Sequence, residues 1–287
     1  MRANAPLEGL KERGTEMATH AERRKAGSEL LAEMTGQPVG FASAAEQRTG
    51  AFGSFVVDYI FGQVWQGDEL SRRDRNIVAL AMLGALERLQ AVQFHASFAP
   101  ANGITREETT EIALQIAGYS GFPAGNEMIN VLVEAWTKAD GKPYRIPPAE
   151  YKDDDQRHRD AVDIMRTLNG QEEAQDPAEA LAGMERIGPV GKLAFEFAFG
   201  DLWSRSQLSR RDRSLVVVSI LVALNKTEEL QFHIPGALNH GVTETELEGV
   251  MATAAPYCGF PRAVEGFRTL RRILRERESQ EEGGHGG

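Results

Sequence analysis

The sequence predicts an all-α protein made of two tandem helical units. Three observations carry this prediction: a long stretch of sequence occurs twice, helix-start signals stand at matching places in both copies, and no segment shows the sustained alternation of a β-strand. The chain has 287 residues, which is room for one large domain or two ordinary ones. With 41% hydrophobic residues, it can build a sizeable core without disulfides.

The repeat keeps one register over most of its length. Leu70–Arg75 recurs letter for letter as Leu208–Arg213, 138 residues later. The same spacing relates Phe61-Gly62 to Phe199-Gly200, Trp65 to Trp203, Gln93–His95 to Gln231–His233, Tyr119 to Tyr257 and Gly121–Pro123 to Gly259–Pro261. Upstream, Glu33–Gly36 resembles Thr167–Gly170 at a spacing of 134, so the register has drifted there. A shared register without insertions indicates two copies of one fold.

Helix signals follow the same order in each copy. We expect a serine N-cap, a buried apolar helix, a glycine stop, a threonine capping box and a last helix with proline in its first turn. In the first copy these are Ser71, Ile77–Leu89, Gly103, Thr105 and Pro123. In the second copy they are Ser209, Leu215–Leu224, Gly241, Thr243 and Pro261.

Breaker-rich sequence separates the two copies. Residues 138–148 hold three prolines and a glycine, and residues 151–155 are charged or polar. We therefore expect a first unit over residues 21–138, a linker over 139–156 and a second unit over 157–278. Residues 1–20 and 279–287 are expected to be disordered, as chain ends commonly are.

Composition and charge exclude several classes of protein. The net charge of −10 and the isoelectric point near 5.2 lack the basic footprint of a nucleic-acid binder. The single cysteine, Cys258, can form neither an intrachain disulfide nor a dithiol redox pair. No apolar run approaches the ~20 residues of a membrane span, and no secretory signal is recognisable, so we expect a cytoplasmic protein with no membrane partner.

One pair of residues has the spacing of a catalytic dyad. Glu229 and His233 lie four residues apart, so on a helix they share a face, where the carboxylate would orient the imidazole and raise its pKa for proton transfer. Such a pair is also an ordinary helix stabiliser around a satisfied histidine. The repeat favours the functional interpretation, because His95 stands at the same place in copy one, where Ala91 replaces the glutamate. This pattern suggests one complete site and one degenerate or accessory site.

The second copy resembles the carboxymuconolactone decarboxylase family, within the wider AhpD-like superfamily. The resemblance rests on Phe199–Trp203, Leu208–Ser214, Leu221–Asn225, Glu229–His233, Ala237–Asn239, Gly241–Thr243, Tyr257–Gly259 and Pro261. It covers nearly all of copy two, and copy one from about Phe52 to Trp136. It implies two AhpD-like helical units that pack as a pseudo-dimer within the chain. Further assembly is expected, as a homo-oligomer of perhaps three chains.

The resemblance also implies a chemistry. It predicts a cofactor-independent lyase that removes carbon dioxide from a small anionic lactone or unsaturated carboxylic acid, with no metal. His233 would transfer the proton and Glu229 would orient it, and His95 is a further candidate catalytic residue. Candidate substrate-binding residues are Gln231, Gln93, Trp203, Trp65, Arg213, Tyr257 and His240. For Arg213 a salt-bridged helix start, and for His240 a helix C-terminal role, are equally open.

Other functions are weighed against this one. The hydroperoxide-reducing relatives carry a CxxC before the histidine, where this chain has Lys226 and Glu229, and Cys258 is expected to be a packed small side chain. The same scaffold would also suit an isomerase, a cyclase or a lactone-processing enzyme of secondary metabolism. A non-catalytic ligand-binding or assembly protein is the third alternative, since fold-level resemblance alone does not fix function.

Overall fold

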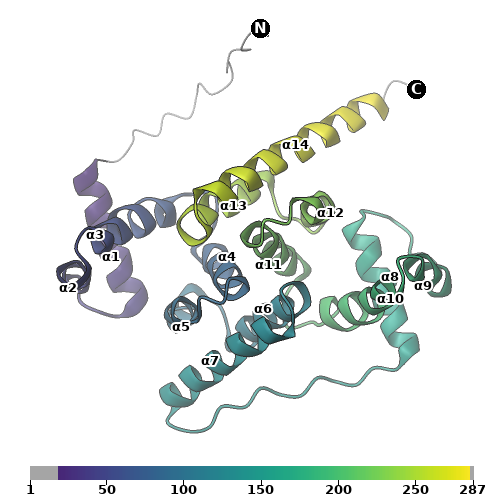
Figure 1. Cartoon of the computed structure of the whole chain (residues 1–287), viewed down its shortest axis with the longest axis horizontal. Helices are drawn as coiled ribbons and strands as arrows, with labels where there is room; N and C mark the ends of the chain where they lie inside the picture. Colours follow the sequence, from purple (N-terminus) through teal and green to yellow (C-terminus); the bar gives the residue numbers. More distant parts are fainter. Residues whose placement is uncertain (1–18, 285–287) are drawn as a thin grey trace. The chain divides into compact units, whose positions relative to one another are not determined.

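Every regular element is a helix in the computed structural model, which describes residues 19–284 apart from the side chains of residues 41, 45 and 280–284 (Figure 1). This confirms the all-α prediction for the described residues. The disorder expected at residues 1–18 and 285–287 lies outside them. The last helix continues to Gly284, past the expected end of the second unit at residue 278. Across this described range, no helix combines the length and the apolar character that crossing a membrane requires.

The helices form two compact units, which divide after Gln66. The described part of the first unit consists of α1 (His20–Thr35), α2 (Gly40–Thr49), α3 (Ala51–Phe55), the π-helical η1 (Val56–Phe61) and the short 3₁₀ turn η2 (Val64–Gln66). In this unit α1 packs so closely on η1 that a Cβ atom at Gly27 would lie 2.1 Å from the carbonyl oxygen of Val57.

The second unit holds the remaining helices. In chain order they are α4 (Arg72–Ala85), α5 (Leu89–Ser97), η3 (Pro100–Asn102), α6 (Arg106–Tyr119), α7 (Phe122–Asp140), α8 (Asp154–Leu168), α9 (Pro177–Glu185), α10 (Pro189–Leu193), η4 (Ala194–Trp203), α11 (Arg210–Ala223), α12 (Thr227–Asn239), α13 (Glu244–Cys258) and α14 (Phe260–Gly284). Residues 141–153, between α7 and α8, form a linker without regular structure.

The helix boundaries repeat as the sequence does. The helices α11, α12, α13 and α14 each begin 138 residues after α4, α5, α6 and α7. The drifted upstream spacing also has a structural counterpart, because α1 and α8 begin 134 residues apart, and Gly36 and Gly170, just beyond their ends, both have a φ of 65°. The expected capping boxes are present at Thr105 and Thr243.

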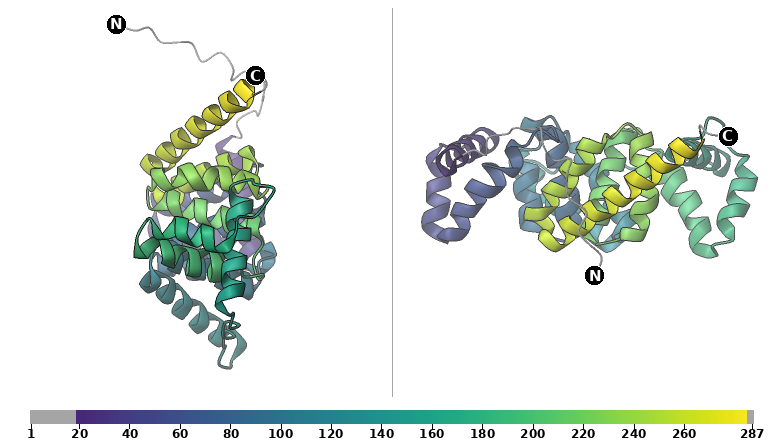
Figure 2. Two further views of the ribbon diagram at one scale, coloured as in Figure 1. Left: turned by 90° about the vertical axis from the view of Figure 1, so that its right-hand side faces the viewer. Right: turned by 90° about the horizontal axis from the view of Figure 1, so that it is seen from above.

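Both copies contribute to one hydrophobic core in the second unit. Its centre is formed by α4 and α11, which pack against each other, with α6 and α7 on one side and α13 and α14 on the other (Figure 1). The last helix lies across α12 and α13 (Figure 2). Residues 77–82 and 215–220 are completely or almost completely buried. The repeat divides the sequence near residue 139, whereas packing joins these helices, because the two copies share this core.

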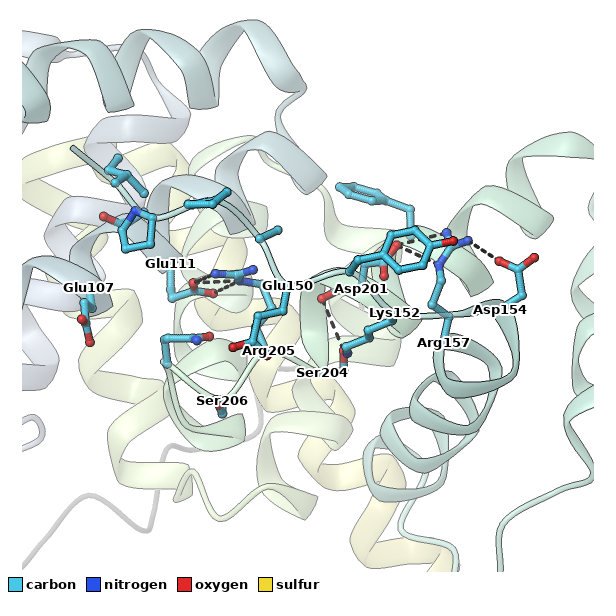
Figure 3. Close-up of a pocket in the computed structure, with 18 of the residues that line it drawn as sticks. Glu107, Glu111, Glu150, Lys152, Asp154, Arg157, Asp201, Ser204, Arg205 and Ser206 are labelled. Carbon is cyan, nitrogen blue, oxygen red and sulfur yellow. Dashed lines mark hydrogen bonds and ion pairs between the residues drawn. The ribbon is translucent and has the colours of Figure 1, made fainter.

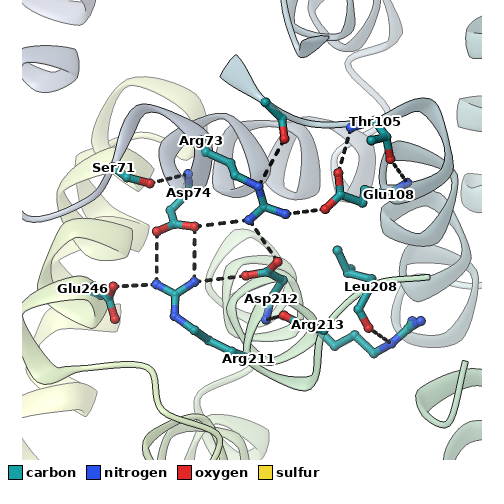
Figure 4. A network of polar contacts seen from close by, with 12 residues as sticks. Ser71, Arg73, Asp74, Thr105, Glu108, Leu208, Arg211, Asp212, Arg213 and Glu246 are labelled. Carbon is teal, nitrogen blue, oxygen red and sulfur yellow. Dashed lines mark hydrogen bonds and ion pairs between the residues drawn. The ribbon is translucent and has the colours of Figure 1, made fainter. Parts of the chain in front are cut away.

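Two crossed ion pairs join the copies at the start of the central helices (Figure 4). Arg73 of α4 bonds Asp212 of α11 at 2.9 Å, and Arg211 of α11 bonds Asp74 of α4 with two contacts of 3.0 and 3.2 Å. Each arginine also bonds the capping-box glutamate of its own copy, Glu108 or Glu246. The arrangement has approximate two-fold symmetry, so the packing within one chain is that of a pseudo-dimer.

These pairs are partly withdrawn from water. Asp74 and Asp212 are 7% and 6% exposed, while the arginines retain more contact with solvent. Burial alone would lower the pKa of Arg211, but its bonds to Asp74 and Glu246 outweigh burial and raise it. Removing one partner of such a pair leaves a charge without compensation, which is costly.

Replacing either aspartate by asparagine is expected to destabilise the protein to a similar degree. We expect Asp74→Asn and Asp212→Asn each to lower the free energy of unfolding by about 2 kcal/mol, because each leaves an arginine of the other copy without its counter-charge. Urea unfolding measures both losses. The exposed pair of Asp154 with Arg157 provides a control, since Asp154→Asn should cost less than about 0.5 kcal/mol. A loss in only one of the two variants would contradict the two-fold arrangement.

Candidate functional site

The environment of His233 is aromatic and largely closed to solvent. Its side chain extends from α12 and is 9% exposed. The ring of Trp203, at the end of η4, is stacked on the imidazole with centroids 6.2 Å apart, and Tyr119, at the end of α6, meets it edge to face at 5.3 Å. Phe232 closes a further side at 5.1 Å. Among the described residues, neither ring nitrogen of His233 has a hydrogen-bond partner, so both are open to an incoming group.

The phenol of Tyr119 is held in one orientation by Trp203. The indole Nε1 of Trp203 donates a hydrogen bond of 2.9 Å to the phenol oxygen. The proton of the phenol has no acceptor within the described part of the chain, so it remains available to a ligand. Tyr119 comes from the first copy, whereas Trp203 and His233 come from the second. The site is therefore composite, and it exists only because the two copies pack together.

Burial sets the protonation states in this cluster. It lowers the pKa of His233 to about 4 and raises the pKa of Tyr119, with the Trp203 hydrogen bond opposing part of that rise. Near pH 7 the imidazole is neutral, with one nitrogen that donates and one that accepts. The phenol keeps its proton. This depressed histidine pKa is opposite to the elevation that the sequence suggested for a carboxylate-paired imidazole.

His95 occupies the equivalent position in copy one. It lies on α5, is 3% exposed, and meets Tyr257 of copy two edge to face at 5.2 Å. This contact matches the pairing of His233 with Tyr119, with the copies exchanged. Phe94 and Phe98 surround the rest of the ring, and burial lowers the pKa of His95 to about 3. The sequence-predicted Tyr257 thus lies beside His95.

The structure does not bring Glu229 and His233 together. Glu229 is exposed, and no hydrogen bond or ion pair joins it to His233 in this well-described helix. The i, i+4 spacing places both residues on one side of α12, but His233 turns toward Tyr119 and Trp203. Gln93 and Gln231 are also exposed, two residues before each histidine. Their proposed roles in substrate binding remain predictions.

Three other candidate residues have structural partners. His240 bonds Ser214 through Nδ1 at 2.8 Å and Thr167 through Nε2 at 2.9 Å, so it ties the end of α12 to α8 and α11. Arg213 is fully buried and bonds Glu111. Trp65 belongs to the first unit, where its ring lies 5.7 Å from that of Phe61. The contacts of His240 and Arg213 favour the structural interpretations that the sequence left open.

The thiol of Cys258 is poorly suited to nucleophilic chemistry. Burial raises its pKa to about 12, against a smaller opposing effect of Arg262, so the thiolate is scarce near pH 7. This agrees with the interpretation of Cys258 as a packed small side chain. Over the residues that the structure describes, histidine, cysteine and carboxylate side chains form no group of three able to hold a metal ion.

The most clearly formed pocket of the second unit lies away from both histidines. It has a volume of about 620 Å³ and is lined by the linker, the first turns of α6, and the end of η4 with the loop after it (Figure 3). Its floor contains Glu111 and Arg205. Sequence reasoning missed both, as it missed Tyr119. The signal for Tyr119 was its alignment with Tyr257, whereas Glu111 and Arg205 stand where the other copy has Gly249 and Gly67.

The fold and the site define an all-helical tandem protein with histidine-centred clusters built across its two copies. Sequence comparison matches residues 50–134 and 189–272, together more than half of the chain, to the carboxymuconolactone decarboxylase family. The chain belongs to this family. The two matched regions correspond to the two copies.

Two relatives illustrate the likeness. The 4-carboxymuconolactone decarboxylase of Acinetobacter baylyi is 27% identical over 123 residues, which cover 43% of this chain and 90% of that protein. The nitrosuccinic acid decarboxylase of Metarhizium robertsii is 29% identical over 126 residues, which cover 42% of this chain and 87% of that protein. Each relative therefore has about the length of one copy.

The buried histidines predict how stability depends on pH. The pKa values of His95 and His233 in the folded chain, about 3 and about 4, lie below the 6.5 of an unfolded histidine. Above pH 6.5 both are neutral in either state. Below it the unfolded chain binds protons that the folded chain does not, so the free energy of unfolding falls by about 1.4 kcal/mol per pH unit for each histidine.

Denaturant unfolding between pH 6.5 and 5 measures this slope. The variant His95→Leu should show a slope that is smaller by the contribution of one histidine. Equal slopes in the two proteins would contradict the buried neutral state of His95.

Proposed function

We propose that the chain is a decarboxylase that needs no cofactor and acts on a small anionic lactone or unsaturated carboxylic acid at the cluster of His233, Tyr119 and Trp203. The observation that carries this proposal is the buried imidazole with two unengaged nitrogens, beside a phenol whose proton is also unengaged. The family and its two named decarboxylases support the same class of reaction.

The substrates in the relatives' names share one chemical property. When carbon dioxide leaves carboxymuconolactone or nitrosuccinic acid, the electron pair of the broken bond is conjugated with a lactone carbonyl or with a nitro group. Negative charge then accumulates on an oxygen. A site for such a reaction must donate hydrogen bonds to that oxygen and deliver one proton to carbon.

The cluster supplies both requirements. Trp203 occupies the acceptor side of the Tyr119 oxygen, which directs the phenol proton toward the developing oxyanion. His233 is neutral in the free protein, but an anion bound beside it raises the imidazole pKa again, because opposite charges favour the protonated form. We infer that His233 then takes a proton from solvent and passes it to the carbon that has lost carbon dioxide. The proposed role of Glu229 in orienting His233 is secondary to that of Tyr119, since Glu229 makes no contact with the ring.

A decarboxylation assay tests this assignment. With γ-carboxymuconolactone as substrate, His233→Ala is expected to abolish carbon dioxide release, while Tyr119→Phe should lower kcat about tenfold, at a cost of about 1.4 kcal/mol in transition-state stabilisation. Glu229→Gln should change kcat less than tenfold. Circular dichroism and size-exclusion chromatography verify that each variant is folded.

Two outcomes would overturn the assignment. Release that persists in His233→Ala would remove His233 from the mechanism. A folded wild-type protein without release would exclude this substrate and favour another reaction on the same scaffold.

We also propose that the chains assemble into a homo-oligomer, with three chains as the expected number. Large apolar side chains stand exposed at equivalent places in both copies, such as Phe122 and Phe260, which are 64% and 63% exposed. Paired exposed aromatics of this kind suit a subunit interface. Light scattering should give a mass of about three chains, and Phe122→Ser with Phe260→Ser should shift it toward one. A wild-type monomer would contradict this.

A further inference from the structure

The pocket beneath the linker is separate from the histidine clusters. Its volume of about 620 Å³ falls in the range of pockets that bind small organic molecules. None of the residues that line it belongs to the clusters around His233 or His95. Figure 3 shows the linker passing over the Arg205–Glu111 pair toward α8. The pocket therefore has no role in the proposed decarboxylation.

Its floor carries more positive than negative charge. Glu111 is 1% exposed and accepts hydrogen bonds from two arginines: Nε of Arg205 reaches its two oxygens at 2.8 and 3.0 Å, and Nη2 of Arg213 reaches one at 2.8 Å. Two guanidinium groups thus share one carboxylate. Nη1 of Arg213 is buried without a hydrogen-bond partner, and Nη1 of Arg205 has none among the described residues.

The fold does not require this arrangement. In the other copy, glycines stand in the places of both Glu111 and Arg205, as Gly249 and Gly67. Arg75, the counterpart of Arg213, bonds Glu69 of its own copy at 3.3 Å and Thr253 at 3.1 Å. The central helices nevertheless pack alike in both copies. The second arginine is therefore an addition on one side only, and it adds a charge without adding a counter-ion.

The other charges of the pocket limit what it accepts. Lys152 is engaged by Asp160 and Ser204, and Arg157 by Asp201, so these cations are already paired. Glu107 and Glu150, which also line the pocket, carry exposed carboxylates. These glutamates disfavour a ligand with two negative charges.

We propose that this pocket binds a small monocarboxylic acid with a flat apolar body. The carboxylate would lie on the free Nη1 edge of Arg205, a planar donor suited to it, within reach of the unengaged side chains of Ser206 and Gln207. Ile146 and Phe197 provide apolar surface for the rest of the molecule. Such a site would let a carboxylic acid bind the protein without entering the His233 cluster.

Isothermal titration with benzoate and benzamide, measured on the full chain, tests the proposal. The two probes have the same shape and differ in charge, so benzoate should bind at least tenfold more tightly. Arg205→Gln should remove that preference while leaving Glu111 paired with Arg213. Arg166→Gln provides the matched control, because Arg166 is similarly exposed and paired with Asp163 but lies outside the pocket.

A second variant covers a failure of Arg205→Gln to fold. Ile146→Asp adds a negative charge to the irregular linker without altering the ion pairs, and it should also weaken benzoate binding at least tenfold. Undetectable benzoate binding to the wild type, or benzoate binding that survives both variants, would overturn the proposal. So would binding that His233→Ala abolishes, because that would place the probe in the histidine cluster. The decarboxylation assay is independent of each of these outcomes.

Discussion

The crossed pairs of Arg73 with Asp212 and Arg211 with Asp74 are the constraint on which the second unit depends. They fix the register of α4 against α11, and each arginine also reaches the capping box of the next long helix in its own copy. A single set of charges thus determines where four helices begin relative to one another. Hydrophobic burial stabilises the core, but it is not directional, whereas these bonds permit one arrangement of the two copies.

Because the copies are fixed in this way, chemistry is distributed between them. His233 receives its phenol from copy one, and His95 receives its own from copy two, with nearly the same ring geometry. The two clusters nevertheless differ in sequence around the histidines, and the pocket beneath the linker has no equivalent ion pair in the other half. The fold is therefore symmetric where it needs to be stable and asymmetric where it meets small molecules.

Much of this fold could be predicted from the sequence, because its signals are local. Caps, glycine stops and apolar periodicity each involve a few neighbouring residues, and the repeat supplied a second reading of each. The site was less accessible. Spacing placed Glu229 near His233, but it could not show that the imidazole turns toward Tyr119, 114 residues earlier in the chain. Likewise, the partner of Arg213 lies on a helix of the other copy, a contact that only packing reveals.

Joining two copies in one chain has a consequence for how such a site can change. In a dimer of identical single-copy chains, every substitution appears at both symmetry-related places at once. A substitution that improves one pocket and harms the other is then rejected. Here Glu111 and Arg205 have replaced the glycines of the other copy on one side only. The fused chain can therefore keep one cluster under selection for its original chemistry while the opposite half acquires a different ligand.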